Sequence, residues 1–124
     1  MTVVLDAGAL IALERGDRTT AAIIEVARRG QRGVVVPAGV VGQVWRDSSR
    51  QARLARLLKA QEVLVEALTE SGARAAGLLC AAAGTADVID ASVVLAARRY
   101  SATVISSDRT DLRALDPDVR VLDC

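Results

Sequence analysis

The sequence predicts an α/β protein, a three-layer α/β/α sandwich around a central, mainly parallel sheet. Hydrophobic residues make up 52% of the 124 residues, with one Trp, one Tyr and no Phe, so the core must consist of small and branched aliphatic side chains. Short Val-rich runs alternate with segments of helical composition, which is typical of buried parallel strands joined by helical crossovers. The length is that of one domain, and we expect residues 1–124 to form a single unit.

The first half of the chain contains two of these apolar runs. Asp6 ends the first run, Gly16 and Asp17 separate two helical segments, and Pro37 stops the second run. The predicted elements are a strand at 1–5, helices at 7–14 and 19–29, a turn at 30–33 and a strand at 34–36.

The second half repeats the pattern with longer helices. Ser48 and Ser49 restart a helix, Thr69 opens another, and Gly84 ends it. The predicted elements are helices at 40–47 and 48–59, a strand at 62–66, helices at 69–83 and 87–100, a strand at 103–105, a short helical turn at 111–115 and a strand at 119–122. In such sheets, ligands bind beyond the carboxyl ends of the strands, where the strand order reverses.

Two acids directly follow predicted strands. Asp6 comes after the first strand and Asp108 follows strand 103–105. Each is also a good N-cap for the helix after it, and taken alone the cap is the simpler interpretation. Because the carboxyl ends of parallel strands share one edge of a sheet, we expect both acids at that edge.

Asp90 is the most informative acid. The residues three, four and seven positions further on are Val93, Val94 and Ala97, so Asp90 continues the apolar stripe of its helix. Asp87 lies one turn earlier on the same side, where it is either part of the cluster or a solvated first-turn residue. A helix N-terminus relieves part of the repulsion between two such carboxylates.

An acidic cluster of this kind favours a hard cation. The chain has no His, and a site built only from oxygen ligands favours Mg²⁺ or Mn²⁺ over Zn²⁺. Mg²⁺ held by few carboxylates keeps several waters, which substrate phosphates can replace. We therefore expect metal-assisted phosphodiester cleavage.

Three segments in this order resemble a PIN-domain ribonuclease toxin of the VapC type, over essentially the whole length of the chain. They are residues 3–6, 85–91 and 104–108, the last with Asp111 and Leu112 after it, and Asp108 follows Asp90 by 18 positions. The resemblance implies a Mg²⁺- or Mn²⁺-dependent endoribonuclease that cuts structured RNA, forms a homodimer and is inhibited by a small cognate antitoxin.

The resemblance also assigns roles to residues. The first, third and fourth acids of the family correspond to Asp6, Asp90 and Asp108, all metal-binding and catalytic, and Asp87 is an accessory acid. Ser106 takes the place of the family's hydroxyl residue, where Thr is more usual. The family commonly has Glu where this chain has Gln43, which carries no charge and cannot act as a base.

Arginine dominates the basic residues. Lys59 is the only Lys among the 16 basic residues, although the net charge is only +1. Arg46, Arg50 and Arg53, with Arg56 beyond them, recur at helical spacing, either as contacts to the RNA backbone or as a solvated helix face.

Two other functions remain open at this point. Gln43 suggests a catalytically weak PIN domain that acts mainly by binding RNA or protein. A phosphoacceptor module of the receiver type also has acids at strand ends, but it needs a Lys near its last strands, where this chain has none.

We expect a cytoplasmic protein with no membrane partner. No apolar run reaches the roughly 18 residues of a membrane span, and no basic region precedes the first strand. Cys80 and Cys124 have no metal-type spacing, so we expect both to be unpaired thiols.

Overall fold

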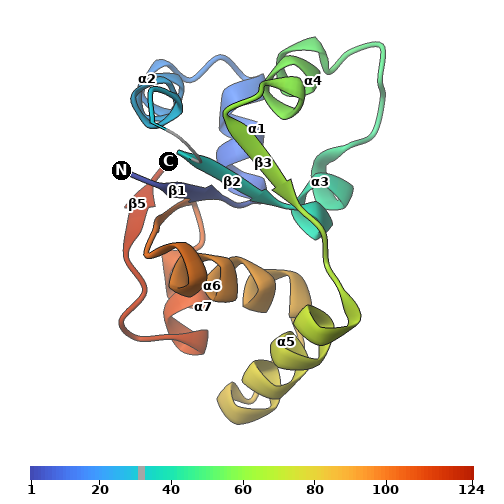
Figure 1. The fold of residues 1–124 in the computed structure, drawn as a ribbon, viewed down its shortest axis with the longest axis vertical. Helices are drawn as coiled ribbons and strands as arrows, with labels where there is room; N and C mark the ends of the chain where they lie inside the picture. The colour runs from blue at the N-terminus through green and yellow to red at the C-terminus, as the bar shows by residue number, and fades with distance from the viewer. Residues whose placement is uncertain (31–32) are drawn as a thin grey trace.

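The structure is a computed structural model that describes residues 1–30 and 33–124. Within these residues it contains one sheet of five parallel strands in the order β3-β2-β1-β4-β5. The strands are Val3–Leu5 (β1), Val34–Pro37 (β2), Val63–Glu66 (β3), Thr103–Ser106 (β4) and Val121–Asp123 (β5). The chain adds β2 and β3 on one side of β1 and then β4 and β5 on the other. The strand order therefore reverses between β1 and β4 (Figure 1).

Helices cover both faces of the sheet, which confirms the predicted three-layer fold. The described helices are Ala7–Glu14 (α1), Arg18–Arg28 (α2), Ala38–Val44 (α3), Ala52–Lys59 (α4), Glu70–Ala83 (α5), Val88–Tyr100 (α6) and Arg109–Leu115 (α7). Helices α1, α2 and α4 lie on one face and α6 on the other, where α5 and α7 pack against α6 (Figure 1). Helix α3 lies at the sheet edge, in contact with α1, α6 and β2.

The core consists of aliphatic side chains, as the composition requires. All residues of β1 and the three valines of β2 are fully buried, and α6 presents buried residues around much of its circumference. Strands buried on both faces favour β-branched residues, which explains the Val runs. Both cysteines are free, Cys80 in the core and Cys124 exposed.

One predicted helical region is wrong. Residues 45–51 form a loop between α3 and α4, whereas we expected a helix that restarts at Ser48 and Ser49. The buried amide of Gln51 accepts hydrogen bonds from the N–H groups of Arg46 and Asp47, at 2.8 and 3.0 Å, and donates to the carbonyl of Val44 at 2.8 Å. Gln51 thus satisfies backbone groups that a helix would have paired internally.

This loop also corrects the prediction of an arginine face. Arg46 and Arg50 lie in the loop and only Arg53 lies in α4, so the three do not share one helical face. Arg46 donates to the carbonyls of Gly42 and Trp45, and Arg50 pairs with Asp47.

The other boundaries differ by a few residues. Strand β2 includes Pro37, which directly precedes α3, helix α7 starts at Arg109, and the last strand starts at Val121. The predicted turn at 30–33 falls partly on residues 31–32, which lie outside the described residues. Within the described ranges no single helix is long and apolar enough to span a membrane; only α5 and α6 together, bent by 106°, reach that length and composition.

Candidate active site

Asp6 lies at the reversal of strand order, directly after β1. Its carboxylate is buried and caps α1, because Oδ1 accepts a hydrogen bond of 3.1 Å from the N–H of Ala9. Its own N–H donates to the carbonyl of Ile105 in β4 at 3.3 Å, which fixes Asp6 against the neighbouring strand. The side chain is therefore both a helix cap and a buried charge at the sheet edge.

Ser106 connects Asp6 to Asp108. The fully buried hydroxyl of Ser106 donates to Oδ2 of Asp6 and accepts a hydrogen bond of 2.8 Å from the N–H of Asp108. The hydroxyl has one proton and two lone pairs, so it serves both groups at once. This shared hydroxyl holds the turn after β4 against the end of β1.

The chain leaves no room for a larger side chain at the start of α1. A Cβ atom added to Gly8 would lie 3.0 Å from the backbone nitrogen of Ser107. The glycine at position 8 therefore allows α1 to approach the turn that carries Asp108.

Burial dominates the electrostatics of Asp6. Desolvation raises its pKa, and the charge of Asp108 raises it further. Hydrogen bonds from Ser106 and Ala9 stabilise the anion and lower the pKa, but the net direction is upward. The site thus holds a carboxylate at a position where its charge is costly.

Asp90 shows the same effect more strongly. It lies half-buried in the first turn of α6, and its pKa is raised from the ordinary value of 3.8 to about 6. Desolvation is the largest cause, and the charges of Asp87, Asp108, Asp6 and Asp111 account for the rest of the increase. The predicted acids are therefore brought together at one edge of the sheet, close enough for their charges to interact.

Asp87 has a defined structural role as well. Its Oδ1 accepts hydrogen bonds from the N–H groups of Ile89 and Asp90, at 3.1 and 3.0 Å, and so caps α6. Asp87 is exposed, as expected for a solvated residue at the start of a helix. Its charge nevertheless raises the pKa of Asp90.

Asp111 is a fifth acid that our sequence analysis did not assign to the site. It lies in the first turn of α7, three positions after Asp108, and its charge raises the pKa of Asp90. The spacing of three on a helix was a usable signal, because it places both carboxylates on one side.

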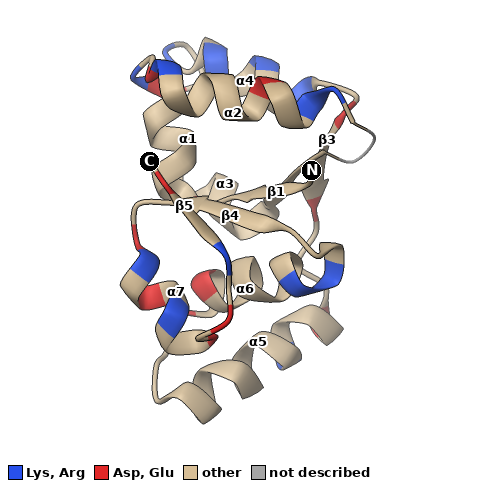
Figure 2. Cartoon of the chain, turned by 90° about the vertical axis from the view of Figure 1, so that its left-hand side faces the viewer, with Lys and Arg blue, Asp and Glu red and all other residues tan. Residues whose placement is uncertain are grey.

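These acids have no cationic partner among the described residues, since none of them takes part in an ion pair. Arg109, which directly follows Asp108, pairs with Asp123 instead, and Arg98 of α6 pairs with Asp116. Figure 2 shows acidic positions at the start of α6 and on α7, while many basic positions lie on α2 and α4 beyond the sheet. The cluster therefore remains a local concentration of negative charge.

The donor set fits a hydrated divalent cation. Within residues 1–30 and 33–124, no three His, Cys, Asp or Glu side chains stand close enough to coordinate one ion directly. Mg²⁺ does not need such a cage, because it commonly binds one or two carboxylates and keeps several waters. One or two carboxylates drawn from Asp6, Asp90 and Asp108 would be enough for this mode of binding.

Gln43 lies on the exposed side of α3, near the end of that helix. Helix α3 contacts both α1 and α6, the two helices whose N-caps are Asp6 and Asp87. Helix α3 therefore packs beside two of the helices that carry the acids Asp6, Asp87, Asp90, Asp108 and Asp111, here called the acidic edge. No hydrogen bond joins Gln43 to these acids among the described residues.

Fold and site together define a class: a parallel α/β/α protein with acids beyond the ends of two adjacent central strands. The family model described as PIN domain matches residues 3–116, and the chain belongs to this family.

Solved structures share the fold over nearly the whole chain. One is VapBC2 from Rickettsia felis, solved in complex with a DNA fragment from the promoter of these proteins. It aligns with a TM-score of 0.70 at 12% identity, covering 100% of this chain and 99% of that one. FitAcB from Neisseria gonorrhoeae aligns with a TM-score of 0.62 at 16% identity, covering 98% of this chain and 96% of that one. PAE2754 from Pyrobaculum aerophilum aligns with a TM-score of 0.61 at 14% identity, covering 99% of this chain and 89% of that one. No protein of curated function matches the sequence.

Proposed function

We propose that this protein is a Mg²⁺- or Mn²⁺-dependent endoribonuclease that acts as the toxin of a toxin–antitoxin pair in the cytoplasm. The observation that carries the proposal is the acidic edge itself. Burial and four neighbouring carboxylates raise the pKa of Asp90 to about 6, and no described basic side chain forms an ion pair with these acids. PIN-domain membership gives a nuclease as the class of activity.

Asp6, Asp90 and Asp108 would hold the metal, with Asp87 at the rim. When bound, the cation supplies positive charge to a phosphate oxygen and lowers the pKa of a water. Ser106 keeps Asp6 and the turn of Asp108 in register through its shared hydroxyl. The caps at Asp6 and Asp87 hold both carboxylates on rigid helix starts, so the ligands are placed before the substrate arrives.

The alternative is a catalytically weak PIN domain that works by binding RNA or protein. Gln43 favours it, because an amide oxygen can orient a water but cannot accept its proton. Metal binding without cleavage would support this alternative.

Two protein partners belong to the proposal. The VapBC2 structure pairs its proteins in one complex, and we infer a small antitoxin that covers the acidic edge of this chain. We also infer a homodimer, for which α5 and the segment before it offer apolar side chains: Leu78 of α5 is 74% exposed, and Leu68, two residues before α5, is 42% exposed.

Arg46, Arg50 and Arg53 are retained as candidates for contacts to the RNA backbone, individually rather than as one helical face. All three side chains reach solvent, and Arg53 donates to the carbonyl of Glu14 at the end of α1. Their loss should weaken binding for all RNA sequences alike.

Cleavage of purified structured RNA in Mg²⁺ or Mn²⁺ tests the function. Asp6→Asn keeps a capping side chain but removes the charge, and it should reduce the cleavage rate at least about 100-fold. Asp17→Asn is the matched control, because Asp17 also caps a helix, through the N–H of Thr20 at 3.0 Å. Equal cleavage by wild type and Asp6→Asn would mean that the activity is a contaminant, and the nuclease proposal would fail.

A further inference from the structure

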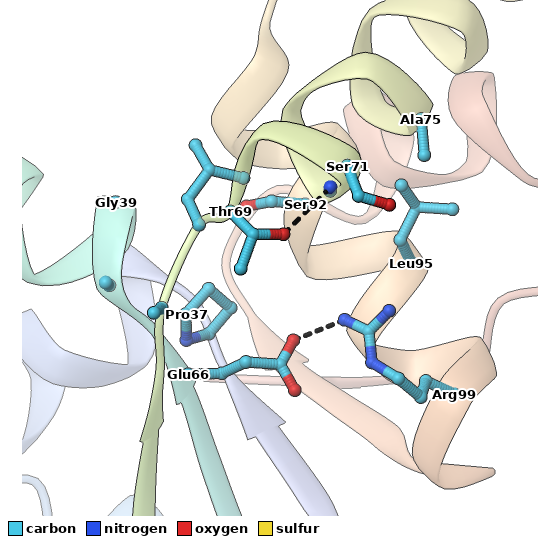
Figure 3. Close-up of a pocket in the computed structure, with 13 residues that line it drawn as sticks. Pro37, Gly39, Glu66, Thr69, Ser71, Ala75, Ser92, Leu95 and Arg99 are labelled. Atoms are coloured by element: carbon cyan, nitrogen blue, oxygen red, sulfur yellow. Dashed lines mark hydrogen bonds and ion pairs between the residues drawn. The ribbon is translucent and has the colours of Figure 1, made fainter.

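A cavity of about 310 Å³ lies at the carboxyl ends of β2 and β3, between α5 and α6 (Figure 3). Its walls are mainly apolar and include Pro37, Leu68, Ala75 and Leu95. This volume is near the lower limit for small-molecule pockets, so it suits one compact ring system and not a drug-sized ligand.

Two charged side chains lie at one end of the cavity and neutralise each other. The guanidinium of Arg99 donates to Oε1 of Glu66, and the hydroxyl of Tyr100 donates to Oε2 at 2.5 Å (Figure 3 shows the Glu66–Arg99 pair). Because the pair carries no net charge, it gives little attraction for a phosphate or a carboxylate. The chemistry favours a neutral ligand with a polar edge.

The pair still has hydrogen-bonding capacity. A guanidinium has five N–H donors and a carboxylate about four acceptor positions, and only part of each is used here. Together the unused positions can supply a donor and acceptors. Every nucleobase presents a donor beside an acceptor on its Watson–Crick edge, and guanine adds a second donor, since O6 accepts while N1–H and N2–H both donate to a carboxylate.

The cavity and the acidic edge are on opposite sides of one helix. Arg99 lies nine residues after Asp90, which is two and a half turns at 3.6 residues per turn, and Ser92 and Leu95 lie on the same cavity side. A helix with its side chains is about 10 Å wide. Nine residues also rise about 13.5 Å along the helix axis, so the two sites lie roughly 17 Å apart. An RNA strand with about 3.4 Å per stacked nucleotide spans this distance in about five nucleotides.

We propose that this cavity binds one base of the RNA substrate, with guanine preferred, about five nucleotides from the bond that is cut. Single-stranded RNA is commonly recognised by bases that turn out of the stack, bond through their Watson–Crick edge and lie against guanidinium planes. The inference rests on the proposed nuclease function and adds a determinant of the cleavage position to it.

Mapping the cut positions in a pool of RNAs with randomised sequence tests the proposal. Wild type should show an enriched guanine near the cut. Glu66→Gln should reduce that enrichment roughly tenfold, because the amide replaces an acceptor with a donor. Asp116→Asn is the matched control: Asp116 also accepts from an arginine of α6, Arg98, but faces away from the cavity, and its variant should keep the wild-type preference.

A second variant fills the cavity at a position where the substitution should not disrupt folding. Ser71 lines the cavity, is exposed and makes no side-chain hydrogen bond among the described residues, so Ser71→Trp should fill the space without unfolding the chain. It should abolish the enrichment while cuts at other positions continue.

Binding of guanosine monophosphate and of uridine monophosphate, followed at backbone amides around the cavity, separates the two proposals. Shifts for guanosine that Ser71→Trp removes support the base site even if no RNA is cut, in which case only the nuclease proposal fails. Active wild type with no guanine preference, or with a preference that both variants keep, overturns the base site. Loss of a dimer in Ser71→Trp without any change in preference assigns the cavity to a protein interface and also overturns it.

Discussion

Glu66 at the end of β3 and the acids beyond β1 and β4 lie at the same edge of one sheet, but their charges are balanced differently. Glu66 is paired with Arg99 and Tyr100, both from α6. Asp90, on the same helix, faces other carboxylates, and its pKa rises to about 6. The fold is therefore able to neutralise a carboxylate at this edge and leaves one group of them without a cation.

This difference distinguishes a structural carboxylate from a functional one. An ion pair built into the fold stabilises it and requires nothing from solution. Acids that repel one another are retained against a cost in stability, which a bound cation would offset. The comparison yields four predictions that separate the two regions.

The largest effect should be on catalysis at the unpaired acids. Asp90→Asn should lower the Mg²⁺-dependent cleavage rate at least about 100-fold, because it removes a proposed metal ligand near the reacting phosphate. Glu66→Gln should still cut RNA at an appreciable rate, with altered positions. Rates under single-turnover conditions measure both, and equal losses in the two variants would remove the distinction.

The second effect concerns Gln43. Gln43→Glu places a carboxylate on α3 at the position where the family commonly has Glu. It should raise the cleavage rate by roughly tenfold, below the usual range of general-base effects. Gln61→Glu, on the loop before β3, adds the same charge elsewhere and is the control. A rate unchanged by Gln43→Glu would show that the amide already performs the role, or that no base acts from α3.

The third effect is on stability in the paired region. Arg99→Met leaves Glu66 without its cation and should lower the melting temperature by about 3 °C, the effect of roughly 1 kcal/mol in a partly exposed pair. Arg74→Met breaks an exposed pair with Glu70 on α5 and should change little. Thermal unfolding followed by circular dichroism compares the two, and identical shifts would argue against a special role for the Glu66 pair.

The smallest effect is on the pH dependence without metal. The folded protein keeps the Asp90 proton up to about pH 6, whereas the unfolded chain releases it near 3.8. The stability that this proton contributes is full below about pH 4 and is lost as the pH rises through 6. In EDTA, Asp90→Asn should therefore melt above wild type at pH 7, by a few degrees, and the gap should close near pH 4. If the melting temperatures of wild type and Asp90→Asn differed by the same amount at every pH, the raised pKa could not be assigned to Asp90.

Much of this arrangement could be predicted from the sequence because it depends on local patterns. Val runs define buried strands, parallel strands place Asp6 and Asp108 at one edge, and the apolar stripe after Asp90 turns that acid inward. These features follow from periodicity and from the geometry of parallel crossovers.

The remaining features depend on contacts between distant residues. Gln51 breaks the predicted helix by bonding to backbone groups of the preceding loop and to Glu14, which lies 37 positions away. Glu66 meets Arg99 across 33 positions. No local pattern marks either partner, so the loop of residues 45–51 and the cavity become visible only in three dimensions.

Thermal unfolding in a Mg²⁺ titration at pH 7 tests the central claim most directly. Mg²⁺ at ten times its dissociation constant should stabilise wild type by about 1.4 kcal/mol, which is roughly 4 °C for a domain of this size. Glu66→Gln should show the same shift and Asp90→Asn little or none. A wild-type melting temperature that does not respond to Mg²⁺ or Mn²⁺, or an equal response in Asp90→Asn, would contradict a metal site at the acidic edge.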